Sequence, residues 1–314
     1  MTRKIVLIDG GMGQELLARS SNKTPRMWSA DYLVSEPDLV RDIHSHYIRA
    51  GATVLTINAY SATYTRMARI NEEDRVPELQ RIACALAIGA RDAAGAKGAD
   101  VAIAGCLSPL NGSYRADRVR DYHLNLDEYR KLVAHQAPFV DLFICETMSS
   151  VIEAQAAVTA GMESGKPVWL GCTVVDNGGT ALRSGERIAD VAGMLGDQNL
   201  KPQALLANCS APESLTAAMP ELAKTGFVFG GYANGFTSIP ADYLPGRTLE
   251  TLSARRDLGP DAYAAFAMQW VEQGASIVGG CCEVGPAHIA RLCERLVDGG
   301  YELAVPADIM GQFD

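Results

Sequence analysis

Eight short apolar runs, separated by longer helical patterns, constrain the fold of this chain more than any other feature. The runs are KIVLIDG, TVLTINAY, VAIAGCLSP, VDLFICET, PVWLGCTV, ALLANCS, GFVFGGYANG and SIVGGCCE, which begin at residues 4, 53, 101, 140, 167, 204, 226 and 276. None alternates strictly between apolar and polar residues, which is typical of parallel strands buried on both faces. Eight strand–helix units over 314 residues predict an α/β fold, a single (β/α)₈ TIM barrel.

The predicted domain covers residues 1–314 as one unit, with a short C-terminal tail after Gly300 that shows no clear period. An open, doubly wound sheet is the alternative. Against it, the first run leads into Asp-Gly-Gly-Met-Gly-Gln, which is not the dinucleotide-binding glycine pattern. Three longer irregular segments, 20–37, 108–122 and 234–260, are expected to cover the same face of the barrel.

Composition excludes several classes of partner. The net charge of −9 provides no basic footprint for nucleic acid. The first apolar run is too short for a signal peptide, and no apolar stretch is long enough to span a membrane. We therefore expect a cytoplasmic protein with no nucleic-acid or membrane partner, and the sequence leaves open a homo-oligomer.

Polar and sulfur-bearing residues gather where the predicted strands end. They are Asp9, Asn58, Glu146, Thr173, Asn208, Cys209, Asn234, Cys281 and Cys282. The carboxyl ends of barrel strands converge on one mouth, which carries the catalytic groups in this fold. The stretch SIVGGCCEVGPAHI places two adjacent cysteines at a strand-to-helix corner, because Gly285 and Pro286 read as a helix start.

The three cysteines among these residues, Cys209, Cys281 and Cys282, come from the sixth and eighth predicted strands. Three thiolates that converge in this way can hold one Zn²⁺ and leave its fourth position open. Without a histidine the site is soft and electron-rich, which suits a sulfur ligand better than the activation of water. The alternatives are no metal, a Cys281–Cys282 disulfide, or a closed site whose fourth ligand comes from another strand end. Candidates for that ligand are Cys106, Cys145 and Cys172.

Four motifs, DGGMGQEL, ICETM, LLANCS and VGGCCEVGPAHI, together closely resemble the homocysteine S-methyltransferases over about residues 5–297. The resemblance implies a (β/α)₈ barrel with one zinc ion and a binding site for homocysteine. The positions that match the family motifs are Cys209, Cys281 and Cys282 for zinc, and Asp9, Gly10 and Glu146 for homocysteine. An amino acid substrate needs a carboxylate for its ammonium and backbone donors for its own carboxylate, so the chemistry of these residues agrees.

The implied reaction is zinc-dependent transfer of a methyl group from a small activated donor to the thiol of L-homocysteine, giving methionine. No catalytic residue is expected beyond the zinc site. The donor stays open among S-methylmethionine, betaine and similar molecules, because the second, fifth and seventh runs depart from the family pattern. Aromatic faces could hold a cationic donor. The candidates are Trp28, Tyr60, Tyr64, Tyr114, Tyr232 and Phe236.

Three other functions are compatible with the cysteines. One is methyl transfer to another small thiol or to a selenol. A second is a non-catalytic barrel that binds zinc or a thiol, although such a protein has no need for Asp9 and Glu146. A third is a redox enzyme that uses the pair Cys281–Cys282 and is active without metal.

Overall fold

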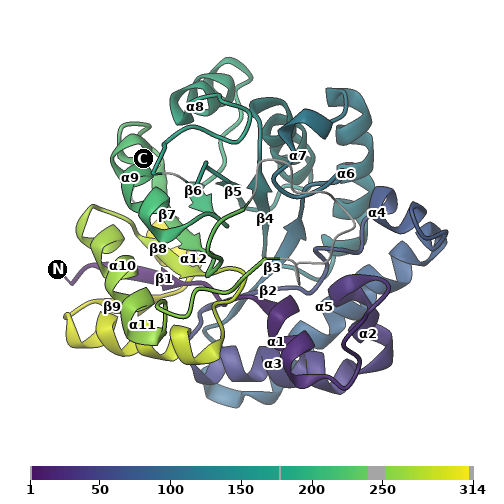
Figure 1. The fold of residues 1–314 in the computed structure, drawn as a ribbon, viewed down its shortest axis with the longest axis horizontal. Helices are drawn as coiled ribbons and strands as arrows, with labels where there is room; N and C mark the ends of the chain where they lie inside the picture. The colour runs from purple at the N-terminus through teal and green to yellow at the C-terminus, as the bar shows by residue number, and fades with distance from the viewer. Residues whose placement is uncertain (1, 177, 240–251, 311–314) are drawn as a thin grey trace.

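The computed structural model describes residues 2–176, 178–239 and 252–310. A ring of strands lies at the centre, and helices surround it (Figure 1). The strands are β1 (Lys4–Leu7), β2 (Val54–Thr56), β3 (Ala102–Leu107), β4 (Leu142–Met148), β5 (Val168–Cys172), β6 (Ala204–Asn208), β7 (Val228–Ala233), β8 (Ile277–Gly280) and β9 (Glu302–Ala304). The longer helices are α1 (Met12–Arg19), α3 (Pro37–Arg49), α5 (Val76–Ala93), α6 (Tyr122–Gln136), α7 (Val151–Glu163), α8 (Ile188–Asp197), α9 (Pro212–Ala223), α10 (Pro260–Glu272) and α11 (Pro286–Asp298).

The strands pair in parallel from β2 through β8, and β8 pairs with β1. A parallel bridge between Ile8 and Val54 then joins β1 to β2. Two backbone hydrogen bonds support this closure, from the amide of Asp9 to the carbonyl of Val54 at 3.0 Å and from the amide of Thr53 to the carbonyl of Leu7 at 2.8 Å. The predicted (β/α)₈ barrel is therefore confirmed, and the open sheet is wrong.

The strands are mostly apolar because both of their faces are buried. In the first strand, Ile5 and Leu7 pack in the layer between the sheet and the helices. Val6 and Ile8 belong instead to the cluster that fills the interior of the ring. This alternation puts the side chains from Ile5 to Ile8 into one of two cores, and it explains why no polar residue interrupts those four positions.

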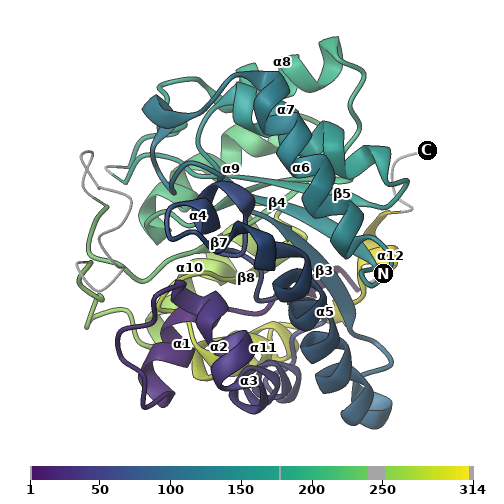
Figure 2. The same cartoon turned by 90° about the vertical axis from the view of Figure 1, so that its right-hand side faces the viewer.

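The tail after Gly300 has structure that the sequence did not predict. β9 pairs in parallel with residues Lys4–Val6 of β1, and the short helix α12 (Pro306–Met310) follows it. Figure 2 shows α12 beside the N-terminus at the right-hand side of the molecule. Ile309 is only 3% exposed and packs in the interior cluster. The tail therefore covers the end of the barrel at which the strands begin.

The segments expected to be irregular contain short helices. Residues 20–37 include η1 (Trp28–Asp31) and α2 (Tyr32–Ser35), and they follow α1. Residues 108–122 include η4 (Ala116–Arg118). Of the third segment, residues 240–251 lie outside the described residues. Within the described ranges, no helix combines the length and the apolar character needed to cross a membrane.

Candidate active site

A cavity of about 100 Å³ lies where the carboxyl ends of the strands meet. Its lining comes from the ends of β1, β2, β4, β6, β7 and β8 and from residues of the two segments at 20–37 and 108–122. All six predicted site residues line it, namely Asp9, Gly10, Glu146, Cys209, Cys281 and Cys282. The structure thus brings together residues that are up to 273 positions apart (282 − 9) in the sequence.

The three cysteines form one compact group. The Sγ atoms of Cys209, Cys281 and Cys282 all lie within 4.8 Å of one another, and no other such group of potential metal ligands occurs among the described residues. The Sγ atoms of Cys209 and Cys282 are 3.8 Å apart. All the cysteines are free thiols, so the described chain has no Cys281–Cys282 disulfide. No fourth cysteine joins the group, which argues against a closed site.

The corner after β8 depends on close packing between backbone segments. A Cβ atom on Gly280 would lie 2.2 Å from Cγ1 of Val284, and one on Gly10 would lie 2.1 Å from the carbonyl oxygen of Val284. Neither glycine has a positive φ; that conformation falls on Glu283, at φ 65°. Both positions therefore require glycine, because any side chain would collide with Val284. The close packing that glycine permits places the opening motif against the Cys281–Cys282 pair.

Contacts among the three cysteines shift the pKa values of their thiols in opposite directions. Burial raises the pKa of the Cys209 thiol, but hydrogen bonds from Cys281, Cys282 and Tyr114 outweigh burial and hold it well below its usual value. Donation to Cys209 in turn raises the pKa of Cys281 and of Cys282. Such a buried, electron-rich sulfur cluster suits a soft cation.

Two buried carboxyl groups lie in the same cavity. Asp9 accepts a hydrogen bond from the amide of Thr56 at 2.9 Å, and the thiol of Cys106 donates to Oε1 of Glu146 at 2.9 Å. Burial raises the pKa of Asp9 well above its usual value and that of Glu146 to about 7. Among the described residues neither carboxyl is in an ion pair, so the site lacks a cation that a ligand with an ammonium group would supply.

Other polar atoms of the cavity also lack partners. The hydroxyl of Tyr232 and the Nε2 atom of Gln14 are buried and form no hydrogen bond within the described part of the chain. Both residues line the cavity. Unpaired buried polar atoms are rare in folded proteins and here are consistent with a polar ligand.

The aromatic candidates fall into two groups. Trp28, Tyr60, Tyr114 and Tyr232 line the cavity, whereas Tyr64 and Phe236 do not. Two of the lining rings already form cation–π contacts with arginines. Arg66 lies 5.2 Å from the ring centroid of Tyr60, and Arg183 lies 4.8 Å from that of Tyr114. A cationic donor therefore has fewer free aromatic faces than the sequence suggested.

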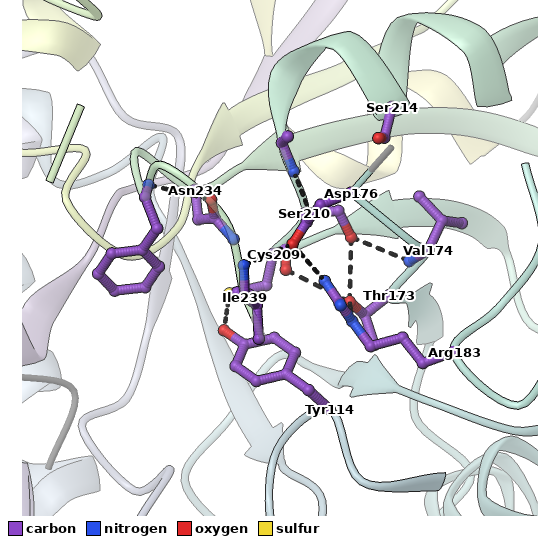
Figure 3. Close-up of polar contacts among 12 residues, drawn as sticks. Tyr114, Thr173, Val174, Asp176, Arg183, Cys209, Ser210, Ser214, Asn234 and Ile239 are labelled. Atoms are coloured by element: carbon purple, nitrogen blue, oxygen red, sulfur yellow. Dashed lines mark hydrogen bonds and ion pairs between the residues drawn. The ribbon is translucent and has the colours of Figure 1, made fainter. Parts of the chain in front are cut away.

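Three residues beside the cavity were missed by the sequence reasoning. Cys106 was considered only as a metal ligand, and it contacts Glu146 instead. Arg183 and Asp176 form a buried ion pair next to the cysteine group (Figure 3). In the sequence, this pair is visible only as two opposite charges, Asp176 and Arg183, in the segment after the fifth run. The chain departs from the family pattern in that segment.

Comparisons with known proteins agree with this geometry. Residues 6–296 match the family described as homocysteine S-methyltransferase. A homocysteine S-methyltransferase from Escherichia coli (strain K12) is 32% identical, and the match covers 93% of this chain and 95% of that protein. A selenocysteine methyltransferase from Astragalus bisulcatus is 26% identical, with 94% of each chain covered.

A solved structure gives the same result. The homocysteine methyltransferase MmuM from Escherichia coli, in its metallated form, superposes with a TM-score of 0.78 at 28% identity, over 93% of this chain and 96% of that one. The metallated neighbour and the three-cysteine group together indicate metal-dependent enzymes. The predicted family and methyltransferase class are confirmed: the chain belongs to the homocysteine S-methyltransferase family.

Proposed function

We propose that this protein transfers a methyl group from a small activated donor to the thiol of L-homocysteine, giving methionine, with zinc as its metal. One observation carries the proposal: a single cavity at the barrel mouth is lined by three thiols and by two carboxyl groups that have no ion pair among the described residues. Sulfur ligands suit a metal that must bind a substrate thiol, and the carboxyl groups suit the ammonium of an amino acid.

The donor set fits zinc. Three sulfur atoms within 4.8 Å of one another match the ligand number of a zinc site that keeps one position open for a substrate. Cys209, Cys281 and Cys282 would hold the ion. When bound, zinc would supply the positive charge that favours the thiolate form of the substrate thiol at neutral pH.

The other residues of the cavity would orient the substrate. Glu146 and Asp9 would bind its ammonium group, and the backbone at Gly10 would lie close to its carboxylate. In the overall reaction the new bond joins the substrate sulfur to the methyl carbon. The bond between that carbon and the donor breaks, the donor keeps the electron pair, and the thiol proton is released.

A selenol is the second candidate acceptor. A relative from Astragalus bisulcatus is named selenocysteine methyltransferase. A soft three-sulfur site would accept selenium as readily as sulfur. Selenocysteine is one methylene shorter than homocysteine, so the distance between the cysteine group and the two carboxyl groups would decide between the two acceptors.

A panel of donors and acceptors tests the proposal. Purified, zinc-loaded protein is incubated with homocysteine or selenocysteine and with S-methylmethionine, betaine or S-adenosylmethionine in turn, and the methylated product is measured. We expect methionine from at least one donor, and no product from the Cys282→Ala variant. If no donor methylates either acceptor, or if product forms equally well after the metal is removed, the proposal is wrong.

A further inference from the structure

The hydroxyl of Tyr114 lies 3.0 Å from the Sγ atom of Cys209. Tyr114 belongs to the segment that crosses the barrel mouth after β3, and its backbone has the left-handed φ of 66°. Its side chain is 6% exposed. A metal-bound cysteine has no proton to donate, so in a metal site that uses Cys209 the tyrosine hydroxyl would be the donor of this contact.

Arg183 fixes the ring of Tyr114 from the side. Its guanidinium lies 4.8 Å from the ring centroid, and it is itself held by Asp176, with an Nη2–Oδ2 distance of 3.1 Å. Both side chains are about nine-tenths buried, at 9% and 10% exposure. A buried and paired arginine is a rigid support, unlike an exposed one that samples many rotamers.

Asp176 ties this pair to the chain around Cys209. Its carboxylate accepts hydrogen bonds from the amide of Ala211 at 2.9 Å and from the amide of Ile239 at 3.0 Å. Figure 3 shows the Tyr114 hydroxyl against Cys209, with Arg183 beside the tyrosine ring. The aspartate thus joins the loop after β5 to the loops after β6 and β7.

Arg183 is also connected to the backbone of Cys209 through the hydroxyl of Thr173. Its Nε atom donates to the hydroxyl of Thr173 at 3.1 Å, and that hydroxyl contacts the carbonyl oxygen of Cys209 at 3.3 Å. Cys209 has a left-handed backbone, at φ 47°. That conformation is costly for a residue with a side chain, so it persists only where neighbouring contacts hold it.

We propose that Tyr114, Arg183 and Asp176 form a supporting layer of the metal centre, in which Tyr114 donates a hydrogen bond to the Cys209 thiolate and the Arg183–Asp176 pair positions it. This inference rests on the proposed function in one respect, namely that Cys209 is a metal ligand. Three thiolates and a substrate thiolate place four negative charges around one divalent ion. The hydrogen bond withdraws charge from one cysteine, which leaves the metal more able to bind the thiolate of the substrate.

The cobalt-substituted protein provides a readout that does not depend on activity. Removing a hydrogen bond raises the energy of the sulfur lone pair, so Tyr114→Phe should move the sulfur-to-cobalt charge-transfer band to lower energy. Zinc affinity, measured by chelator competition, should fall roughly 10- to 100-fold, as for other residues that support metal ligands. Arg183→Met should shift the band in the same direction by a smaller amount.

Tyr129→Phe is the matched control. Tyr129 is also a buried tyrosine, and its hydroxyl donates at 3.0 Å to the carbonyl of Ser108, which lies in the same loop as Tyr114. Tyr129 itself does not line the cavity that contains Cys209, Cys281 and Cys282. This variant can loosen the loop, but it should leave the cobalt band unchanged. An equal shift in Tyr129→Phe and Tyr114→Phe would overturn the inference, because loop packing alone would then explain the effect.

Cys209→Ala separates this inference from the proposed function. If that variant loses the charge-transfer intensity of one thiolate while Tyr114→Phe has a wild-type spectrum, the supporting layer is refuted and the metal site stands. If Cys209→Ala keeps the full spectrum, Cys209 is not a ligand, and both the ligand assignment and the supporting layer are wrong.

Discussion

The two ends of the barrel differ in how their polar groups are paired. At the carboxyl end, Asp9 and Glu146 are buried without an ion pair among the described residues, and the hydroxyl of Tyr232 has no partner there. At the amino end, Asp141 accepts from the amide of Ile103 at 2.7 Å and lies 3.5 Å from Arg91. The groups at the carboxyl end are thus left for a ligand to pair with, whereas Asp141 at the amino end is already paired with Arg91.

Cavity volume does not indicate which end of the barrel has the unpaired polar groups. A hollow of about 920 Å³ lies at the amino end, between the start of β3 and residues Val305–Ala307, whereas the cavity at the carboxyl end measures about 100 Å³. Among the described residues that line the larger one, none has a buried side-chain nitrogen or oxygen atom without a hydrogen-bond partner. Barrel enzymes carry their chemistry at the carboxyl ends of the strands, so substitutions at the two ends should have separable effects.

The largest effect is expected for Cys282→Ala at the carboxyl end. Zinc content after dialysis should fall from about one ion per chain to nearly none, because two cysteines cannot replace a three-cysteine site. The melting temperature should change far less. Cys293→Ala is the control, since this half-buried cysteine of α11 lies outside the cysteine group. Stoichiometric zinc in Cys282→Ala would place the metal elsewhere.

Glu146→Gln should weaken homocysteine binding by about tenfold to a hundredfold, which corresponds to the loss of about 1.5–3 kcal/mol from a charge-assisted hydrogen bond. Zinc content should hardly change. Glu153→Gln is the matched control: Glu153 is equally buried, its pKa is also raised by burial to about 7, and it contacts Ser149 outside the cavity. A variant with unchanged homocysteine affinity but a lower melting temperature would make Glu146 a structural residue only.

At the amino end, Ile309→Ala should reduce stability and leave the active site intact. Truncating a buried isoleucine costs about 2–5 kcal/mol, and we expect the lower limit here because α12 is a short helix. Denaturant titration measures the loss, and homocysteine affinity should match that of the wild type. A drop in affinity comparable to that of Glu146→Gln would show that the two ends are coupled.

The pH dependence of binding gives a smaller effect. Burial raises the pKa of Glu146 to about 7, and only the ionised carboxylate attracts an ammonium group. Homocysteine affinity should therefore rise with pH through about 7, by roughly tenfold between pH 6 and pH 8. Other groups also titrate in this range, so the difference between wild type and Glu146→Gln isolates the carboxyl group. Parallel pH profiles for the two proteins would contradict this assignment.

The smallest effect concerns the exposed ion pair between Lys4 and Asp308, whose nitrogen–oxygen distance is 3.1 Å. Both side chains are more than one-third exposed, so Lys4→Ala should cost no more than about 1 kcal/mol. Thermal unfolding at low and high salt measures the stability lost in this variant. A loss as large as that of Ile309→Ala would mean that this pair, rather than apolar burial, holds the tail on the barrel.

The sequence alone predicted the barrel, and its motifs predicted six site residues, which the structure places around one cavity. Each strand is buried on both faces, so its residues must be apolar wherever they point, and this requirement is visible in a single sequence. The convergence of the strand ends follows from the closed ring, so residues such as Asp9, Glu146 and Cys209 could be placed together without coordinates. The two cysteine motifs, LLANCS and VGGCCEVGPAHI, indicated the family, because few other families contain both motifs in this order.

Only the tertiary structure decided how the remaining residues are paired. Arg183 stacks on Tyr114 across 69 positions (183 − 114), the thiol of Cys106 contacts Glu146, and β9 joins β1 from the other end of the chain. Short segments and single loop residues leave no periodic pattern in a sequence. Their partners are set by loop conformations and by which side chains the closed ring brings within reach, and the energy of each contact exists only once the barrel has formed.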